Sequence, residues 1–181
     1  MKVKIKKRFV ALAIGTGLVS CIANSASDNT INFQGEVTDQ TCSVTVNGNT
    51  TAPVVLMPTV STSDLSASGE TAGQTTFTMG LTGCTANTSA STTVSTVFVG
   101  NNVSSAGNLG NTGTASNVDV QILDTANTVI DLTDGYTASG DLTLATDATE
   151  SSADYTAQYY ATGASTAGTV AASLQYAVTY Q

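Results

Sequence analysis

Hydrophobic residues recur at every second position in several stretches of this chain, and this period of two restricts its fold more than any other feature. The longest run consists of Val170, Ala172, Leu174, Tyr176, Val178 and Tyr180. Shorter runs are Ile31, Phe33 and Val37; Val44 and Val46; Phe77, Met79 and Leu81; and Val118, Val120 and Ile122. A period of two places alternate side chains on one face of a β-strand. We therefore predict a half-buried strand at each run, including a single C-terminal strand.

Turn-forming residues separate these runs. They are Asn47-Gly48, Ser68-Gly69, Gly100-Asn101-Asn102, the Gly-rich stretch 107–113, Asp134-Gly135 and Ser139-Gly140. Two continuous apolar runs, 54–57 and 97–99, predict strands that are more fully buried. Many short strands with frequent turns are typical of an all-β sandwich.

Charge divides the chain into two parts. All five basic residues lie within the first eight positions, and all 13 carboxylates lie from Asp28 onward. The basic head continues into an apolar stretch, 9–19, and then into small residues around Ala23 and Ala26, which is the order of parts in a secretory signal peptide. The stretch is shorter than the roughly 20 residues that span a bilayer. We predict that residues 1–26 are a signal peptide, cleaved between about Ala23 and Ala26.

A second interpretation of the head is a lipoprotein signal. Leu18-Val19-Ser20-Cys21 resembles the site at which bacterial lipoproteins are cleaved and lipidated on cysteine. The intact mass of the exported protein distinguishes the two interpretations.

The predicted mature chain contains no Lys, Arg or His, so its side chains carry a charge of −13. Trypsin cleaves after Lys or Arg, and we therefore expect the mature protein to survive trypsin even when reduced and fully denatured. Electrophoresis of the digest checks this expectation. Fragments from a denatured sample would show that the basic head is retained or that the chain is not exported.

Removal of the signal peptide also removes Cys21 and leaves Cys42 and Cys84 as a pair. Two cysteines in an oxidising compartment favour a disulfide bond. Two buried free thiols are the alternative, because a zinc site lacks further ligands without His.

Several function classes are excluded by the same composition. Without His or Lys the mature chain has no Ser-His-Asp or Cys-His arrangement and no substitute base. The carboxylate pairs Asp131 with Asp134 and Asp147 with Glu150 fit no EF-hand loop. A chain without cations has no means of neutralising phosphates. We expect no enzyme activity, no cofactor, no metal and no nucleic-acid partner.

Four stretches carry a resemblance to a known family: 31–37 leading to Cys42, 81–84, 117–124 and 157–163. They resemble the major subunit, or pilin, of type 1 fimbriae, which Gram-negative bacteria assemble by the chaperone–usher pathway. The chain is also similar to that family in its C-terminal signature, here Gly168 and the penultimate aromatic residue Tyr180.

The resemblance implies an incomplete immunoglobulin-like sandwich that lacks its last strand and is completed by a donor strand from a neighbouring subunit. Residues 1–26 are then the signal peptide, 27–37 a donor-strand extension running into the first strand, and 38–181 the pilin domain. The donor strand comprises Asn29, Ile31, Phe33, Gly35 and Val37. The acceptor groove and chaperone-binding strand comprise Gly168, Val170, Ala172, Leu174, Tyr176, Val178 and Tyr180.

What the resemblance implies about function is polymerisation. The expected partners are identical subunits in a helical homopolymer, a periplasmic chaperone, an outer-membrane usher, and tip adhesin or adaptor subunits. The expected location is extracellular, in a fimbria used for adhesion on a Gram-negative surface, after transit through the periplasm. The alternative is a minor adaptor or tip subunit of the same system with a carbohydrate-binding role.

Overall fold

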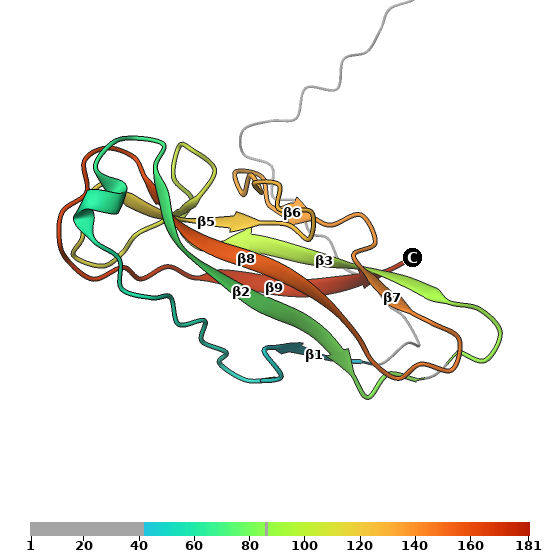
Figure 1. The fold of residues 1–181 in the computed structure, drawn as a ribbon. Helices are drawn as coiled ribbons and strands as arrows, with labels where there is room; N and C mark the ends of the chain where they lie inside the picture. The colour runs from blue at the N-terminus through green and yellow to red at the C-terminus, as the bar shows by residue number, and fades with distance from the viewer. Residues whose placement is uncertain (1–41, 86) are drawn as a thin grey trace, which may run out of the picture. The chain divides into compact units, whose positions relative to one another are not determined.

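Two antiparallel sheets form the part of the chain that the computed structural model describes, residues 42–85 and 87–181 (Figure 1). The first sheet has the strand order β1-β2-β8-β5-β4. Its strands are β1 (Ser43–Val46), β2 (Thr71–Thr82), β8 (Ser151–Ala161), β5 (Val118–Leu123) and β4 (Leu109–Gly110). The second sheet is built on β3 (Thr92–Gly100), which pairs with β6 (Tyr136–Thr137), β7 (Leu142–Leu144) and β9 (Leu174–Tyr180). One short 3₁₀ helix, η1 (Thr62–Leu65), precedes β2.

The core lies between the sheets, where the predicted alternation places it. Phe77, Met79 and Leu81 of β2 are buried together, as are Val118, Val120 and Ile122 of β5. From the second sheet, Val94 and Phe98 join the same hydrophobic cluster. The prediction of strands at these runs, with these side chains in the core, is confirmed.

The turn at Asn47-Gly48 shows how the predicted loop residues act. Both residues have positive φ angles, 50° and 79°. Val46 and Asn49 exchange two backbone hydrogen bonds of 2.9 and 3.0 Å across them. This is the two-residue hairpin geometry that Asn-Gly favours, and it reverses the chain directly after β1.

The prediction of a buried strand at 54–57 is wrong. This segment is extended but belongs to neither sheet, and Val54 and Leu56 are 71% and 83% exposed. Pro53 and Pro58 flank the run and lack the N–H group that a sheet ladder requires. The run 97–99 does lie in a strand, β3, but it is not fully buried, since Val99 is 51% exposed.

The C-terminal run forms a shorter strand than the sequence predicts. β9 begins at Leu174, whereas 168–173 follows an irregular path. Even so, the even-numbered residues from Val170 to Tyr180 are half-buried against the core, and Ala171, Ser173, Gln175 and Ala177 are exposed. The predicted face is therefore continuous although the strand is not.

Strand β5 is covered on both faces, which its alternation does not predict. Gln121, on the face opposite Val120, is buried in a chain of amide side chains. In that chain Gln74 donates to Gln158, Gln158 to Gln121 and Gln121 to Asn108, at 2.9, 2.7 and 3.2 Å. These bonds cross β2, β8 and β5 and continue to the residue before β4, so they tie four neighbouring strands together.

Two predicted segments lie outside the described residues, the signal peptide 1–26 and the donor extension 27–37. In the part of the chain that is described, no helix has the length and apolarity needed to cross a membrane.

Candidate functional site: an apolar groove beside the C-terminal strand

An apolar hollow of about 510 Å³ opens into the core between two separate segments of the chain. One wall is the extended segment 53–57, and the other is formed by 170–174 with Tyr176. Core residues of both sheets line the space between these walls, among them Phe77, Met79, Phe98 and Ile122. The hollow therefore reaches side chains of the hydrophobic core, which are themselves almost fully buried.

A second hollow of about 590 Å³ extends the first. It is lined by residues just before and within η1 and by 165–170. Tyr159 and Val170 line both hollows, so they mark the point where the two meet. We call the two hollows together the groove.

The backbone of β9 leaves one edge of the second sheet open along the groove. Gln181 N–H donates to Thr93 O, and Asn101 N–H donates to Ser173 O. Odd-numbered residues thus turn their backbone groups toward β3, so Leu174, Tyr176 and Val178 turn theirs away from it. Within the described residues β9 pairs with β3 alone.

The opposite wall, segment 53–57, also has backbone groups without a backbone partner in the part of the chain that the structure describes. None of its N–H or C=O groups bonds to a backbone group of the described residues. All five residues border the first hollow; Val55 and Met57 are partly buried against the core, whereas Val54 and Leu56 are exposed. The two walls therefore present apolar side chains and open hydrogen-bonding edges to the same space, which is what an added strand requires.

A tight contact between 111–117 and 164–171 fixes the start of the C-terminal wall. Thr112 N–H donates to Ala171 O, and Ala115 N–H donates to Thr169 O, at 2.8 and 3.0 Å. A Cβ atom on Gly168 would collide with the backbone nitrogen of Ala115. Gly168 is therefore required for close backbone approach, and the contact anchors this wall to the first sheet just before β5.

A hydrogen-bonded cluster of aromatic side chains supports the core residues that line the groove. The ring of Tyr155 lies 5.0 Å from that of Phe98 and 5.8 Å from that of Phe77. Its hydroxyl donates to Asp141 Oδ2 at 2.8 Å. The backbone N–H and the hydroxyl of Thr96 donate to the same carboxylate at 2.8 and 2.6 Å. Burial and the bond to Asp141 raise the pKa of Tyr155.

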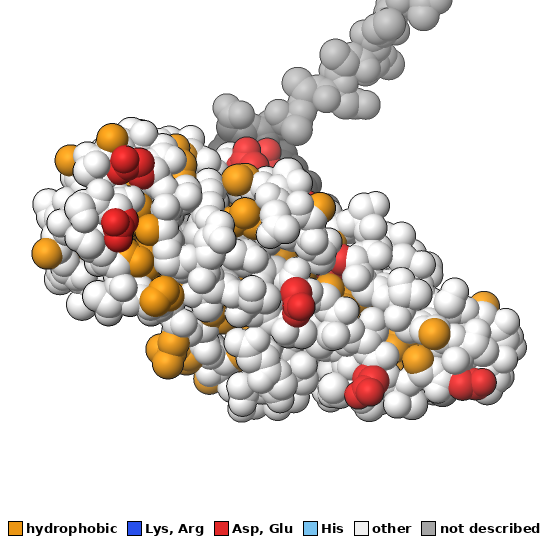
Figure 2. Space-filling view, in the orientation of Figure 1, with side chains coloured by type: hydrophobic (Ala, Val, Ile, Leu, Met, Phe, Trp, Pro, Cys, Tyr) orange, Lys and Arg blue, Asp and Glu red, His pale blue; other side chains and the backbone are white. Residues whose placement is uncertain are grey.

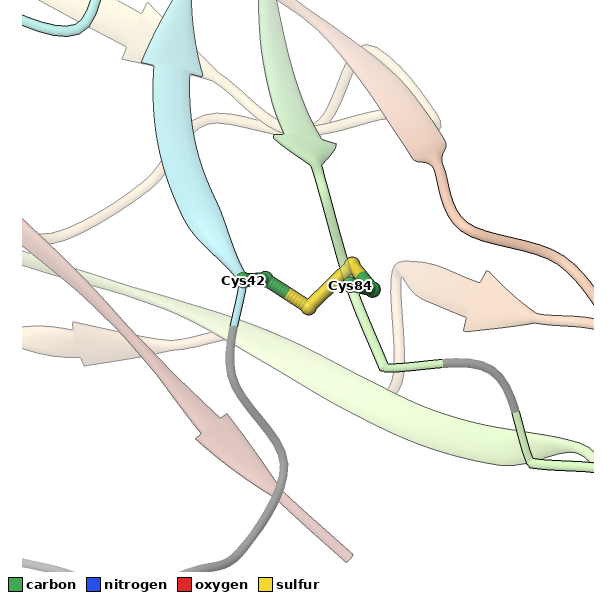
Figure 3. The surroundings of a disulfide bond; sticks show 2 residues. All are labelled: Cys42 and Cys84. Atoms are coloured by element: carbon green, nitrogen blue, oxygen red, sulfur yellow. A yellow bond between two sulfur atoms is a disulfide. The ribbon is translucent and has the colours of Figure 1, made fainter.

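A disulfide joins Cys42, immediately before β1, to Cys84, just after β2 (Figure 3). Cys84 is buried, and its backbone N–H donates to Thr149 O at 3.0 Å. The predicted pairing is confirmed. The bond fixes the point where the chain enters the first sheet, directly after the predicted donor extension.

The structure brings together most of the residues that the sequence assigns to the acceptor strand. Val170, Ala172, Leu174 and Tyr176 line the first hollow, and Gly168 lines the second. Val178 and Tyr180 lie farther along β9, where they are half-buried against the core but line neither hollow. The assigned donor residues Asn29, Ile31, Phe33, Gly35 and Val37 lie outside the described residues.

The opposite wall and the meeting point at Tyr159 are not predicted from the sequence. No sequence pattern separates the partly buried from the exposed residues of this wall, because 53–57 is apolar throughout; the difference appears only in the structure. Nothing local marks Tyr159, whose place in the groove follows from the packing of β8.

No charged side chain lines the groove, and among the described residues no group of three or more His, Cys, Asp or Glu is placed to hold a metal ion. The carboxylates visible on one face of the molecule are scattered rather than gathered (Figure 2). The first hollow is mainly apolar, whereas Ser and Thr side chains line much of the second.

Comparison with known proteins identifies the family. The model of the fimbrial protein family matches residues 31–181. This chain belongs to the fimbrial protein family. Two similar relatives are the F17 fimbrial protein of Escherichia coli, 38% identical over 91% of this chain and 96% of the relative, and the major fimbrial subunit SMF-1 of Stenotrophomonas maltophilia, 36% identical over 88% and 96%.

Among solved structures, a chaperone–usher pilus studied for the uncoiling of its rod matches this fimbrial protein with a TM-score of 0.59. The match covers 86% of this chain and 96% of the other at 20% identity, so the likeness is one of fold. The prediction of an incomplete immunoglobulin-like sandwich is confirmed. Fimbrial proteins are structural subunits, and this one is not an enzyme.

Proposed function

We propose that this fimbrial subunit polymerises into the shaft of a surface fimbria by donor-strand exchange. In this proposal residues 27–37 of one subunit fill the groove of the next. The observation that carries the proposal is the groove itself, which has two apolar walls, each with an open backbone edge, in a chain of a family of fimbrial subunits. The relative from Stenotrophomonas maltophilia is named a major fimbrial subunit, which supports the shaft over a minor or tip position.

The proposed donor matches the groove in chemistry. Ile31 and Phe33 are apolar and share parity, so an extended strand directs both into the first hollow. Each contributes roughly 1.5 to 3 kcal/mol if fully buried. The donor backbone meanwhile pairs with the open edges of β9 and segment 53–57. Filling the groove thus covers core surface and satisfies backbone groups in one step.

The meeting point of the two hollows suggests a register. A strand that crosses both hollows passes Tyr159 and Val170, and alternate side chains on a strand lie about 6.6 Å apart. Gly35 is the one donor position without a side chain. We place Gly35 at this meeting point, with Ile31 and Phe33 in the first hollow and Val37 in the second. The donor then runs antiparallel to β9.

The same groove explains the need for a partner before assembly. Exposed apolar surface beside an open strand edge favours aggregation. We propose that a periplasmic chaperone covers the groove until an outer-membrane usher presents the subunit to the growing fimbria. We further propose that tip adhesin or adaptor subunits belong to the same fimbria, and that the fimbria is extracellular, on a Gram-negative cell.

Self-complementation tests the proposal. The mature chain is given a second copy of residues 27–37 behind Gln181, joined by a short turn that directs it antiparallel to β9. We expect a soluble monomer that no longer polymerises, measured by sedimentation and electron microscopy. The control is the same added copy with Phe33→Asp, which should leave polymerisation intact. If the added strand and its control behave alike, the groove does not accept residues 27–37.

A further inference from the structure

The side chain of Asn111, directly after β4, connects its loop to the C-terminal wall of the groove. Its Nδ2 group donates to Ala115 O and Thr169 O at 2.8 and 3.4 Å. Its Oδ1 accepts from the N–H groups of Gly113 and Ala171, both at 2.8 Å. We propose that Asn111 is a positioning residue for the donor strand, because it fixes the wall at the meeting point of the two hollows. The proposal rests on the function proposed above.

The bonds to the wall lie on both sides of Val170, which lines both hollows. Thr169 and Ala171 are the residues immediately before and after it. Their remaining backbone groups bond to the same loop. Thr169 N–H donates to Thr114 Oγ1 at 2.9 Å, and Ala171 O accepts from Thr112 N–H at 2.8 Å. The backbone on either side of Val170 therefore cannot shift without loss of several hydrogen bonds.

Two glycines allow the loop and the wall to approach this closely. A Cβ atom on Gly113 would collide with Thr169 O, and one on Gly168 would collide with the backbone of Ala115. The two backbones therefore meet without side chains between them. The amide of Asn111 spans this contact, because it bonds to two residues of each segment.

The ring of Tyr159, which also lines both hollows, is held in place as well. A Cβ atom on Gly73 would lie 2.8 Å from Cδ2 of Tyr159, so the ring packs closely against the backbone of β2. A close-packed ring has no space into which it can withdraw on that side. The room at the meeting point thus depends on the wall at Val170, which Asn111 holds.

This arrangement explains why a residue without a side chain suits the donor at this point. In the register proposed above, Gly35 lies at the meeting point. Because Asn111 holds Val170 in place, a side chain at position 35 overpacks a site that does not widen, which lowers affinity by about tenfold or more. Asn111 therefore makes the groove selective for glycine at this position of the donor.

Competition between two donor peptides tests the proposal. The chaperone-bound subunit is offered equal amounts of a peptide of residues 27–37 and of the same peptide with Gly35→Leu, and mass spectrometry gives the ratio incorporated. We expect the unsubstituted subunit to prefer glycine by about tenfold, and Asn111→Ala to reduce the preference to about threefold or less. General destabilisation of the subunit would affect both peptides alike and leave the ratio unchanged.

Asn101→Ala is the matched control on the same wall. The amide of Asn101 also bonds to the C-terminal segment, at 2.9 and 3.1 Å, but its partners there are the side chains of Ser173 and Gln175. Its removal leaves the backbone beside Val170 bonded to the loop. We expect this variant to keep the preference of the unsubstituted subunit.

Asn111→Asp provides a second variant of nearly the same size. It keeps an oxygen that accepts from Ala171 N–H, but it places a charged oxygen against the carbonyl groups of Ala115 and Thr169 in place of a donor. The preference for glycine should therefore fall here too.

Four results would overturn the proposal. They are an unsubstituted subunit that incorporates both peptides equally, an unchanged preference in both Asn111 variants, an equal decrease in Asn101→Ala, and failure to recover either Asn111 variant with its chaperone. An unsubstituted subunit that incorporates neither peptide would instead count against the proposed function.

Discussion

Ile31→Asp or Phe33→Asp in the donor extension is expected to abolish filament formation while the subunit still folds on its chaperone. A carboxylate in place of either side chain forfeits roughly 1.5 to 3 kcal/mol of burial and adds the cost of removing a charge from water. The mutant's own groove is unchanged, so its chaperone complex should persist. Co-purification with the chaperone, together with electron microscopy of the cell surface, measures the two effects separately.

Tyr180→Ser provides the contrasting variant. Tyr180 is half-buried near the end of β9, the strand that the chaperone is expected to engage. Its loss should act before assembly, so that the subunit is degraded in the periplasm and little chaperone complex is recovered. Donor variants that assemble normally, or that lose the chaperone as severely as Tyr180→Ser, would show that residues 27–37 form a strand of their own domain.

Cys42→Ser is expected to lower subunit abundance strongly without altering the groove. The bond closes a loop with a sequence separation of 42, and on the chain-entropy model this stabilises the fold by about 4 kcal/mol. That is a large fraction of the stability of an ordinary domain. Immunoblots of periplasmic extracts and urea unfolding of the chaperone-free monomer give the two measurements.

Cys84→Ser and the double variant serve as controls for the disulfide. If the effect comes from the bond, all three variants should fall to the same abundance, because removing either partner breaks the same constraint. Two alkylatable thiols in native filaments would contradict the argument outright. A decrease confined to Cys84→Ser would indicate a packing defect at this buried site instead of loss of the bond.

The strands of the core could be predicted from the sequence because their alternation records burial directly. Phe77, Met79 and Leu81 share parity and share a face, and every neighbouring strand contributes such a set. The same argument fails at 54–57, where a continuous apolar run predicts a buried strand that the structure does not contain. An apolar run predicts that a segment contacts the core, but it does not predict which of its side chains face the core. In this segment only alternate residues pack against the core.

Half of the groove could likewise be predicted. The even-numbered face from Val170 onward was assigned from its period, and four of its residues line the first hollow. The register at Gly168 could not be derived, because the atom that excludes a side chain there belongs to Ala115, far away along the chain. The wall at 53–57 was missed for the same reason, since it acquires its role only from the residues across the groove.

By itself, the sequence determined the features that depend on local pattern and composition. These are the strand faces, the turn at Asn47-Gly48, the pairing of Cys42 with Cys84 as the cysteines of the mature chain, and the confinement of cations to the first eight positions. Only the tertiary structure decided that segments 53–57 and 170–176 stand on either side of a hollow bordered by core residues, and that Val54 and Leu56 are exposed. An open edge depends on segments that are far apart in the sequence. It exists only where packing brings two walls together and leaves the space between them without a strand.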